Sequence, residues 1–179
     1  MVLLAAVLIQ ATVGGMLEPQ SAEKGKPAFT FGKQAYFHRY SKDNLQEFTP
    51  KGQSDLQKWT DMVTVNSYAN AKDGDALAGA ANSVLETYKA NKAVVVKTSS
   101  VPRTPTKPAE HLIVVLFPHP EFIEASFSRF LLSKGVGFSV VYSHRIYGKK
   151  AGDALSQWLL KNGEKSEKEL MAMPAVPKH

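Results

Sequence analysis

The chain has 179 residues, no cysteine, and 22 Lys and Arg against 16 Asp and Glu, which gives a net charge of +6. The lack of cysteine excludes disulfides, cysteine-ligated zinc and thiol catalysis, while the length is enough for one domain with a substantial core. The excess of positive charge favours contact with anionic material or with an acidic protein.

An apolar run without charged residues, Val2 to Leu17, opens the chain. Val2 to Ile9 is typical of the apolar core of a secretory signal peptide, and small residues offer cleavage after Gly15 or after Ala22. The basic segment that precedes such a core is missing, which indicates a late start codon or a truncated sequence. A membrane anchor is the alternative, although a spanning helix needs about 20 apolar residues. We therefore expect residues 1–22 to be a signal peptide or N-terminal apolar segment, and the protein to be periplasmic or secreted.

Alternation of apolar and polar residues predicts three strands in the first half of the chain. They cover residues 29–37, 45–49 and 62–68. Between the last two, Ser54 and Gln57 form a capping-box pattern that predicts a short helix through Trp59.

A helical stripe of apolar residues then predicts one long amphipathic helix over residues 75–91, with Asp73 or Asp75 as its N-cap. A short apolar strand follows over residues 93–98. The prolines at 102, 105 and 108 favour an extended connection that a partner groove could bind. A stiff surface connection is the simpler interpretation.

Three further strands are predicted over residues 111–117, 122–132 and 136–144. The first is apolar on both faces, which indicates a covered, central position. The second also fits a helix, and we choose a strand because residues 133–135 form a hairpin turn into the third.

Two helical segments end the chain in this interpretation. The first covers residues 153–162 and ends at Gly163 in the usual C′ position. Ser166 and Glu169 repeat the capping-box pattern and predict a short last helix, and residues 174–179 then form a flexible tail.

Together these elements predict an α+β fold over a single domain, residues 23–173. We expect a curved, mostly antiparallel sheet with one long helix (about 75–91) and one shorter helix (about 153–162) packed on one face. This outline is similar to the cystatin-like, NTF2-like and PsbP/Mog1-like folds. The similarity is one of shape and implies no function.

The search for catalytic motifs is negative. The sequence has no G-x-S-x-G elbow, no G-x-x-x-x-G-K-[ST] loop, no H-E-x-x-H and no G-x-G-x-x-G. Phosphate cradling and serine-hydrolase chemistry therefore have no support. We expect no cofactor and favour a protein that is not an enzyme.

Three histidines in predicted strands, His38, His111 and His144, are candidates for a metal site. Neighbouring strands could bring two or three imidazoles together as copper or zinc ligands. None of them shows ligand spacing such as H-x-H, and no carboxylate accompanies them at a regular interval. Hydrogen-bonded or exposed histidines are the simpler interpretation.

Arg129 falls on the apolar face of its predicted strand, where an unpaired guanidinium would cost several kcal/mol. Glu86, Glu110 or Glu124 could pair with it, and the sequence does not choose among them. A paired structural arginine is the simpler interpretation, and a site for an anionic ligand is the alternative.

The end of the last predicted strand concentrates aromatic and polar side chains: Tyr142, His144, Arg145 and Tyr147. Strand ends commonly line ligand sites, so these four residues and Arg129 are the candidate ligand-binding set. Ser143 beside His144 does not make a catalytic pair, because adjacent strand residues face opposite ways.

The leading hypothesis is an exported, non-enzymatic binding or accessory protein of the periplasm or envelope. Its basic surface would contact a protein or an anionic envelope component, including the membrane periphery, and we expect no nucleic acid. The alternatives are a periplasmic metal-binding protein that uses histidines, and a small cavity-type hydrolase or isomerase with an Asp or His base.

Overall fold

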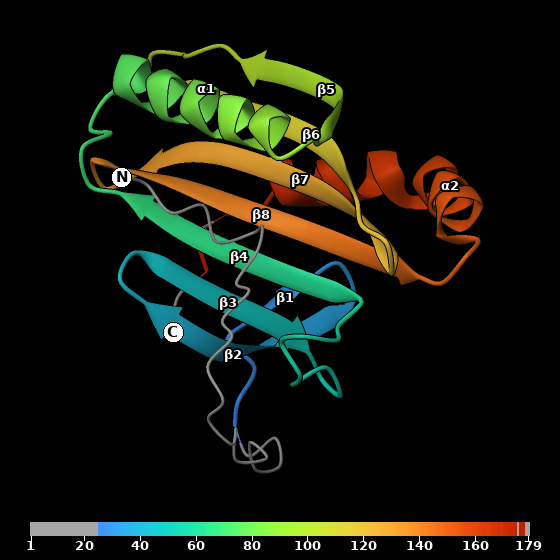
Figure 1. Ribbon diagram of the computed structural model, residues 1–179. Coiled ribbons are helices and arrows are strands. Elements are labelled where there is room, and N and C mark those ends of the chain that lie inside the picture. The colour runs from blue at the N-terminus through green and yellow to red at the C-terminus, as the bar shows by residue number, and fades with distance from the viewer. Residues whose placement is uncertain (1–24, 175, 178–179) are drawn as a thin grey trace.

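Eight strands form one curved, open antiparallel sheet (Figure 1). The computed structural model describes residues 25–174, 176 and 177. The strands are β1 (Phe29–Phe31), β2 (Gln34–Lys42), β3 (Leu45–Pro50), β4 (Asp61–Tyr68), β5 (Val94–Val101), β6 (Glu110–Pro118), β7 (Phe122–Ser133) and β8 (Val136–Tyr147). Their order in the sheet is β1-β2-β3-β4-β8-β7-β6-β5. The predicted α+β class and antiparallel sheet are confirmed, and the apolar segment at residues 1–22 lies outside the described residues.

The two helices, α1 (Gly74–Ala90) and α2 (Ala151–Met171), pack on opposite faces of this sheet (Figure 1). Strand β6 shows the division, because Val115 belongs to the apolar cluster under α1 and its neighbour Val114 to the cluster under α2. The prediction of both helices on one face is wrong. A strand that is apolar on both faces needs cover on both. We call these surfaces the α1 face and the α2 face.

The long helix α1 matches its predicted position. Asp73 is the N-cap, and its carboxylate accepts a hydrogen bond of 2.8 Å from the backbone N–H of Ala76, which satisfies one of the free donors of the first turn. The buried stripe consists of Leu77, Ala81, Val84 and Tyr88. The phenol of Tyr88 bonds the hydroxyl of Ser128 on β7 at 3.0 Å.

Helix α2 is one continuous helix, where the sequence predicts two. Gly163 lies inside it, and Ser166 is buried against the sheet instead of capping a new helix. An interior glycine costs a helix only about 1 kcal/mol. Burial of Leu155 before the glycine and Leu170 after it, both on the α2 face, offsets that cost.

The predicted first strand is a hairpin of two strands, β1 and β2. Gly32 has a φ of 59° and occupies the first position of a two-residue turn between Phe31 and Gln34, the arrangement that type II′ hairpins favour. The turn shifts the alternation by one residue. Tyr36 is therefore the buried side chain of β2, with 1% exposed, and Phe37 is only partly buried.

The helix predicted for residues 54–59 is absent, because this stretch forms turns without helical structure. The carboxylate of Asp55 accepts a hydrogen bond from the backbone N–H of Gln57 at 2.8 Å. Asp and Ser in such positions support turns as well as helix starts.

The strand chosen for residues 122–132 is confirmed as β7. It joins β8 through a tight turn in which Lys134 and Gly135 have φ values of 53° and 73°. Two successive positive φ angles are typical of a type I′ hairpin. The predicted strand at residues 93–98 is also confirmed, as β5 at the edge of the sheet.

Val176 lies within the segment that the sequence predicts to be a flexible tail. This side chain is 6% exposed and belongs to the apolar cluster on the α2 face. In the described part of the chain, neither helix is long and apolar enough to cross a membrane.

Candidate functional site

The candidate residues at the end of β8 divide between the two faces of the sheet. Tyr142 and His144 lie on the α2 face, and Arg145 and Tyr147 lie on the α1 face, because successive strand residues point to opposite sides. The corner around this strand end therefore holds two separate clusters, one on each face of the sheet.

On the α2 face, the carboxylate of Asp61 is the centre of a hydrogen-bonded cluster. Its Oδ1 accepts from the hydroxyl of Tyr142 at 2.8 Å and from Nδ1 of His144 at 2.9 Å. Its Oδ2 accepts from the hydroxyl of Thr60 at 3.0 Å. The indole of Trp158 on α2 stacks on the His144 ring with centroids 4.0 Å apart.

The electrostatics of this cluster favour a charged Asp61. Burial raises the pKa of the Asp61 carboxyl, but hydrogen bonds from His144 and Tyr142 and the charge on His144 outweigh it, so the pKa lies below its usual value. Burial and the neighbouring Asp61 raise the pKa of Tyr142, so its phenol remains a donor. Asp61 thus orients the imidazole in the way that an acid orients a catalytic base.

Ser143, the hydroxyl residue that precedes His144 in the sequence, does not face the imidazole. Ser143 points to the other face, where its hydroxyl lies 3.3 Å from that of Ser126, and both residues are buried. Ser143 and His144 therefore do not form a nucleophile–base pair.

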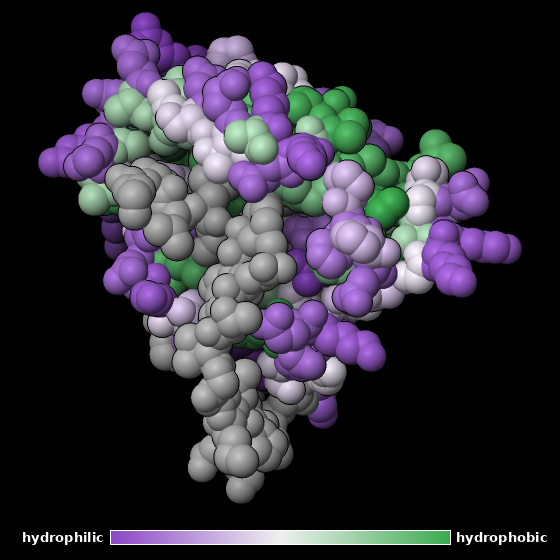
Figure 2. Space-filling view, viewed as in Figure 1, coloured by the Kyte–Doolittle hydropathy of each residue, from purple (hydrophilic) through white to green (hydrophobic). Residues whose placement is uncertain are grey.

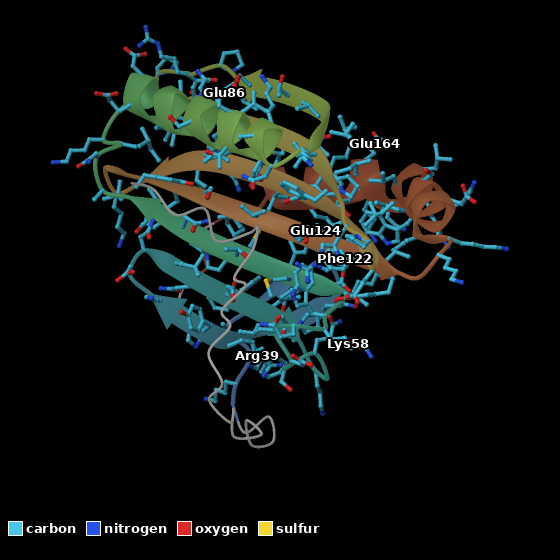
Figure 3. All side chains as sticks on the ribbon, in the orientation of Figure 1. Arg39, Lys58, Glu86, Phe122, Glu124 and Glu164 are labelled. Atoms are coloured by element: carbon cyan, nitrogen blue, oxygen red, sulfur yellow. The ribbon has the colours of Figure 1, made fainter. Side chains whose placement is uncertain are left out.

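On the α1 face, Arg145 is enclosed by aromatic rings and a carboxylate. Its guanidinium lies 3.8 Å from the ring centre of Trp59 and 4.2 Å from that of Phe122, and its Nε donates to Glu124 at 2.8 Å. Tyr147 donates to the carbonyl of Trp59 at 2.9 Å. Figure 3 shows Phe122 and Glu124 close together on β7. The positive charge of Arg145 is therefore balanced by Glu124 and by the two aromatic rings.

Arg129 lies apart from the other candidate residues. It pairs with Val140 on β8, four positions from His144, or about 13 Å along the strand. Its guanidinium makes two bonds to Glu110, of 2.7 and 2.9 Å, and donates to the carbonyls of Leu170 and Met173. The interpretation of a paired structural arginine is therefore the one that the contacts support.

The three candidate metal ligands are not brought together. His38 is on β2, His111 on β6 and His144 on β8. Four strands separate β2 from β6, a distance of about 24 Å at the usual strand spacing. Among residues 25–174, 176 and 177, no three His, Asp or Glu side chains are placed to hold a metal ion.

Sequence reasoning missed Asp61 and Trp158. The signal for Asp61 was present, because it shares a strand face with the apolar Val63 and Val65, as Arg129 shares one with apolar residues. Trp158 had no such signal, since its contact with His144 depends on how α2 lies on the sheet.

The second feature that sequence reasoning missed is the exposure of β5. All eight of its side chains are exposed, and Val94, Val96 and Val101 are 56%, 53% and 51% exposed. Apolar atoms gather over the end of β5 that follows α1 (Figure 2). Lys92 precedes the strand and Arg103 follows it, and neither forms an ion pair with another described residue.

Comparison with known proteins identifies a family and a fold. A protein-family model matches residues 24–175, and no curated protein matches the sequence. A mutant of the protein Mog1 superposes with a TM-score of 0.50 at 7% identity, over 76% of this chain and 83% of that one. The Ran-binding protein Mog1p of Saccharomyces cerevisiae gives 0.46 at 9% identity, over 76% and 82%. Human STARD10 gives 0.31 at 9% identity, over 78% and 74%.

At such low identity the similarity to the Mog1 mutant shows the fold alone. Of the three outlines expected from the sequence, it supports the PsbP/Mog1-like one.

Proposed function

This chain belongs to the protein family whose model spans residues 24–175, and we propose that it is a non-enzymatic protein that binds an extended segment of another protein along β5. The observation that carries the proposal is the complete exposure of this eight-residue edge strand, including four valines. Natural proteins usually shorten, charge or cover a sheet edge to prevent pairing with other chains. This edge carries Lys97 and a bulge between Val95 and Lys97, but the exposure of its valines at both ends favours a use for it.

The physical basis of binding would be strand addition. β5 pairs with β6 alone, so the backbone groups on its outer side are available to a partner strand. Backbone hydrogen bonds to such an edge supply affinity, and side chains of the added strand supply specificity. Burial of the exposed valines would add a hydrophobic contribution of about 25 cal/mol per Å² of apolar surface.

We propose that the protein has no catalytic role because the buried and partly buried charged side chains of its candidate site pair with one another. Arg129 and Arg145 are each bonded to a buried or partly buried glutamate, and Asp61 is bonded to His144. Groups that satisfy each other in this way hold strands and helices in place. Among the described residues, Asp61, Arg129 and Arg145 therefore have charged partners within the protein.

The test compares edge variants with a matched surface variant. Peptides that bind the full chain are selected from a random library, and the double variant V96K/V101K is expected to weaken their binding about tenfold or more. L160K, which also removes an exposed apolar side chain but lies on α2, is expected to bind as the unchanged protein does. Equal binding to all three proteins would overturn the proposal.

A small hydrolase or isomerase is the second candidate, because Asp61 orients the imidazole of His144. H144N and D61N are the variants that address it. We expect any turnover of ester or sugar substrates by the purified protein to survive both substitutions. Turnover that disappears in H144N but persists in H111N would favour the enzyme.

We also propose that the protein binds its partner outside the cytoplasm. The apolar run at Val2 to Leu17 supports this location, and the charge of +6 suits an acidic protein or an anionic envelope component. The test is fractionation of a Gram-negative host, with intact mass measured for each fraction. A periplasmic species that begins after Gly15 or Ala22 supports export, and a full-length cytoplasmic species contradicts it.

A further inference from the structure

A hollow of about 390 Å³ lies on the α1 face directly beside the edge strand. Residues from α1, β5 and β6 line it, among them Ala81, Leu85, Ser100 and His111. Figure 1 shows α1 lying along β5 and β6, so that the hollow follows the edge proposed to bind a partner. A side chain that a partner strand directs to this face would meet the hollow.

His111 in the wall of the hollow has one satisfied and one unsatisfied nitrogen. Its Nδ1 lies 2.8 Å from the hydroxyl of Ser100. Its Nε2 is buried and has no hydrogen-bond partner among the described residues. In that part of the chain, Oε1 of Gln46 is the only other buried side-chain atom without a partner. A buried polar atom without a partner is unfavourable unless a ligand satisfies it.

The charges around β5 indicate the sign of the partner. Lys92 lies before the strand, and Arg103 and Lys107 lie after it, all three without an ion pair to another described residue. A second copy of the chain is a poor partner, because antiparallel pairing of two β5 strands would bring Lys92 of one copy towards Arg103 of the other. An acidic segment would experience attraction at both ends.

We propose that the hollow receives an Asp or Glu side chain of the bound segment, whose carboxylate accepts a hydrogen bond from Nε2 of His111. The inference rests on strand addition to β5, since an added strand directs alternate side chains to the α1 face. A hydrogen bond to a charged carboxylate is stronger than one between two neutral groups. The partner is therefore an extended segment in which acidic residues alternate with apolar ones.

The test uses two synthetic peptides of the length of β5 that alternate Val and Thr and carry either Glu or Gln at the central position. Binding to the full chain is measured by fluorescence anisotropy. The Glu peptide is expected to bind about tenfold more tightly than the Gln peptide. H111F is expected to abolish this difference and to leave the weaker binding in place. H119F, a change in an exposed turn, is expected to preserve it.

The edge variant separates failure of the inference from failure of the proposed function. If V96K/V101K weakens both peptides but the Glu and Gln peptides bind the unchanged protein equally, the His111 contact is wrong and strand addition stands. If the Gln peptide, which carries no charge for the added lysines to attract, binds the edge variant and the unchanged protein alike, strand addition is wrong. Because H111F could disturb packing, S100A provides a second variant, which removes the hydroxyl next to Nδ1 of His111. Thermal unfolding of each variant verifies its fold.

Discussion

Arg129 on β7 forms a two-point ion pair with Glu110 on β6, with nitrogen-to-oxygen distances of 2.7 and 2.9 Å. The remaining terminal nitrogen of the guanidinium donates to the carbonyls of Leu170 and Met173, where α2 ends. The last carbonyls of a helix have no partner within it and carry partial negative charge. Arg129 therefore fastens the end of α2 to the sheet.

Replacement of Arg129 by Met is expected to lower the free energy of unfolding by about 2–4 kcal/mol, because it leaves Glu110 and two helix-end carbonyls without their donor. Urea unfolding followed by circular dichroism measures the loss. Lys168 provides the control, since its ion pair with Glu164 is largely exposed and K168M should leave the free energy of unfolding nearly unchanged. Equal losses in the two variants would contradict the role assigned to Arg129.

Asp61 is expected to make stability fall in acid. Its folded pKa lies below the usual value, so its contribution is complete above the unfolded pKa of about 3.9 and is lost as the pH falls towards the folded pKa. D61N should lower the free energy of unfolding by about 1–3 kcal/mol near neutral pH. The difference from the unchanged protein should shrink below about pH 4.

Urea unfolding over a pH series tests this expectation. The control is D43N, because Asp43 is exposed in a turn with a φ of 51° that Asn accepts readily. A difference between D61N and the unchanged protein that stays constant down to about pH 2 would show that the carboxylate charge is not the source of the effect.

The elements that the sequence predicted well are those whose local pattern agrees with their burial. Strands β7 and β8 are joined by a turn that a glycine makes possible, and both have the length of interior strands. Helix α1 has an apolar stripe and a capping Asp73. In each case propensity, periodicity and packing favour the same structure.

The errors arise where a local signal is overruled by contacts distant in sequence. Apolar alternation runs on through Gly32, so the β1–β2 hairpin looks like one strand. Gly163 is a typical helix end, yet packing on the α2 face carries the helix past it. The partner of Arg129 could not be chosen among three glutamates, because the choice of Glu110 depends on β6 lying beside β7.

Glu47 is expected to have the opposite effect on stability to Asp61. Burial raises its pKa to about 7, although the charge of Arg145 opposes the shift. The folded protein then binds a proton that the unfolded chain, with a pKa of about 4.3, has released. Stability therefore declines as the pH rises from about 4.3 through about 7.

The variant E47Q should remove this decline. We expect the variant to gain on the order of 2 kcal/mol relative to the unchanged protein between about pH 4 and pH 8. E86Q is the control, since the ion pair of Glu86 with Lys89 is exposed. The measurement is again urea unfolding at each pH, and parallel curves for E47Q and the unchanged protein would exclude a raised pKa for Glu47.

Two glycine-to-alanine substitutions are expected to change stability in opposite directions. An added Cβ at Gly137 on β8 would lie 2.6 Å from the Cβ of the buried Ala71 and 3.2 Å from its carbonyl oxygen. Since the backbone of Ala71 must move, G137A should cost about 1–3 kcal/mol. An added Cβ at Gly163 would make an ordinary contact of 3.6 Å with Leu159, and G163A should stabilise the protein by up to about 1 kcal/mol.

The second substitution also tests the continuity of α2. Gly163 is not among the glycines with positive φ, so alanine fits its helical backbone and reduces the entropy of the unfolded chain. If the helix instead ended there, as the local sequence predicts, the glycine would be left-handed at C′ and alanine would be strained. Urea unfolding distinguishes the two structures by sign: a gain in G163A requires one helix from Ala151 to Met171, and a loss requires a break.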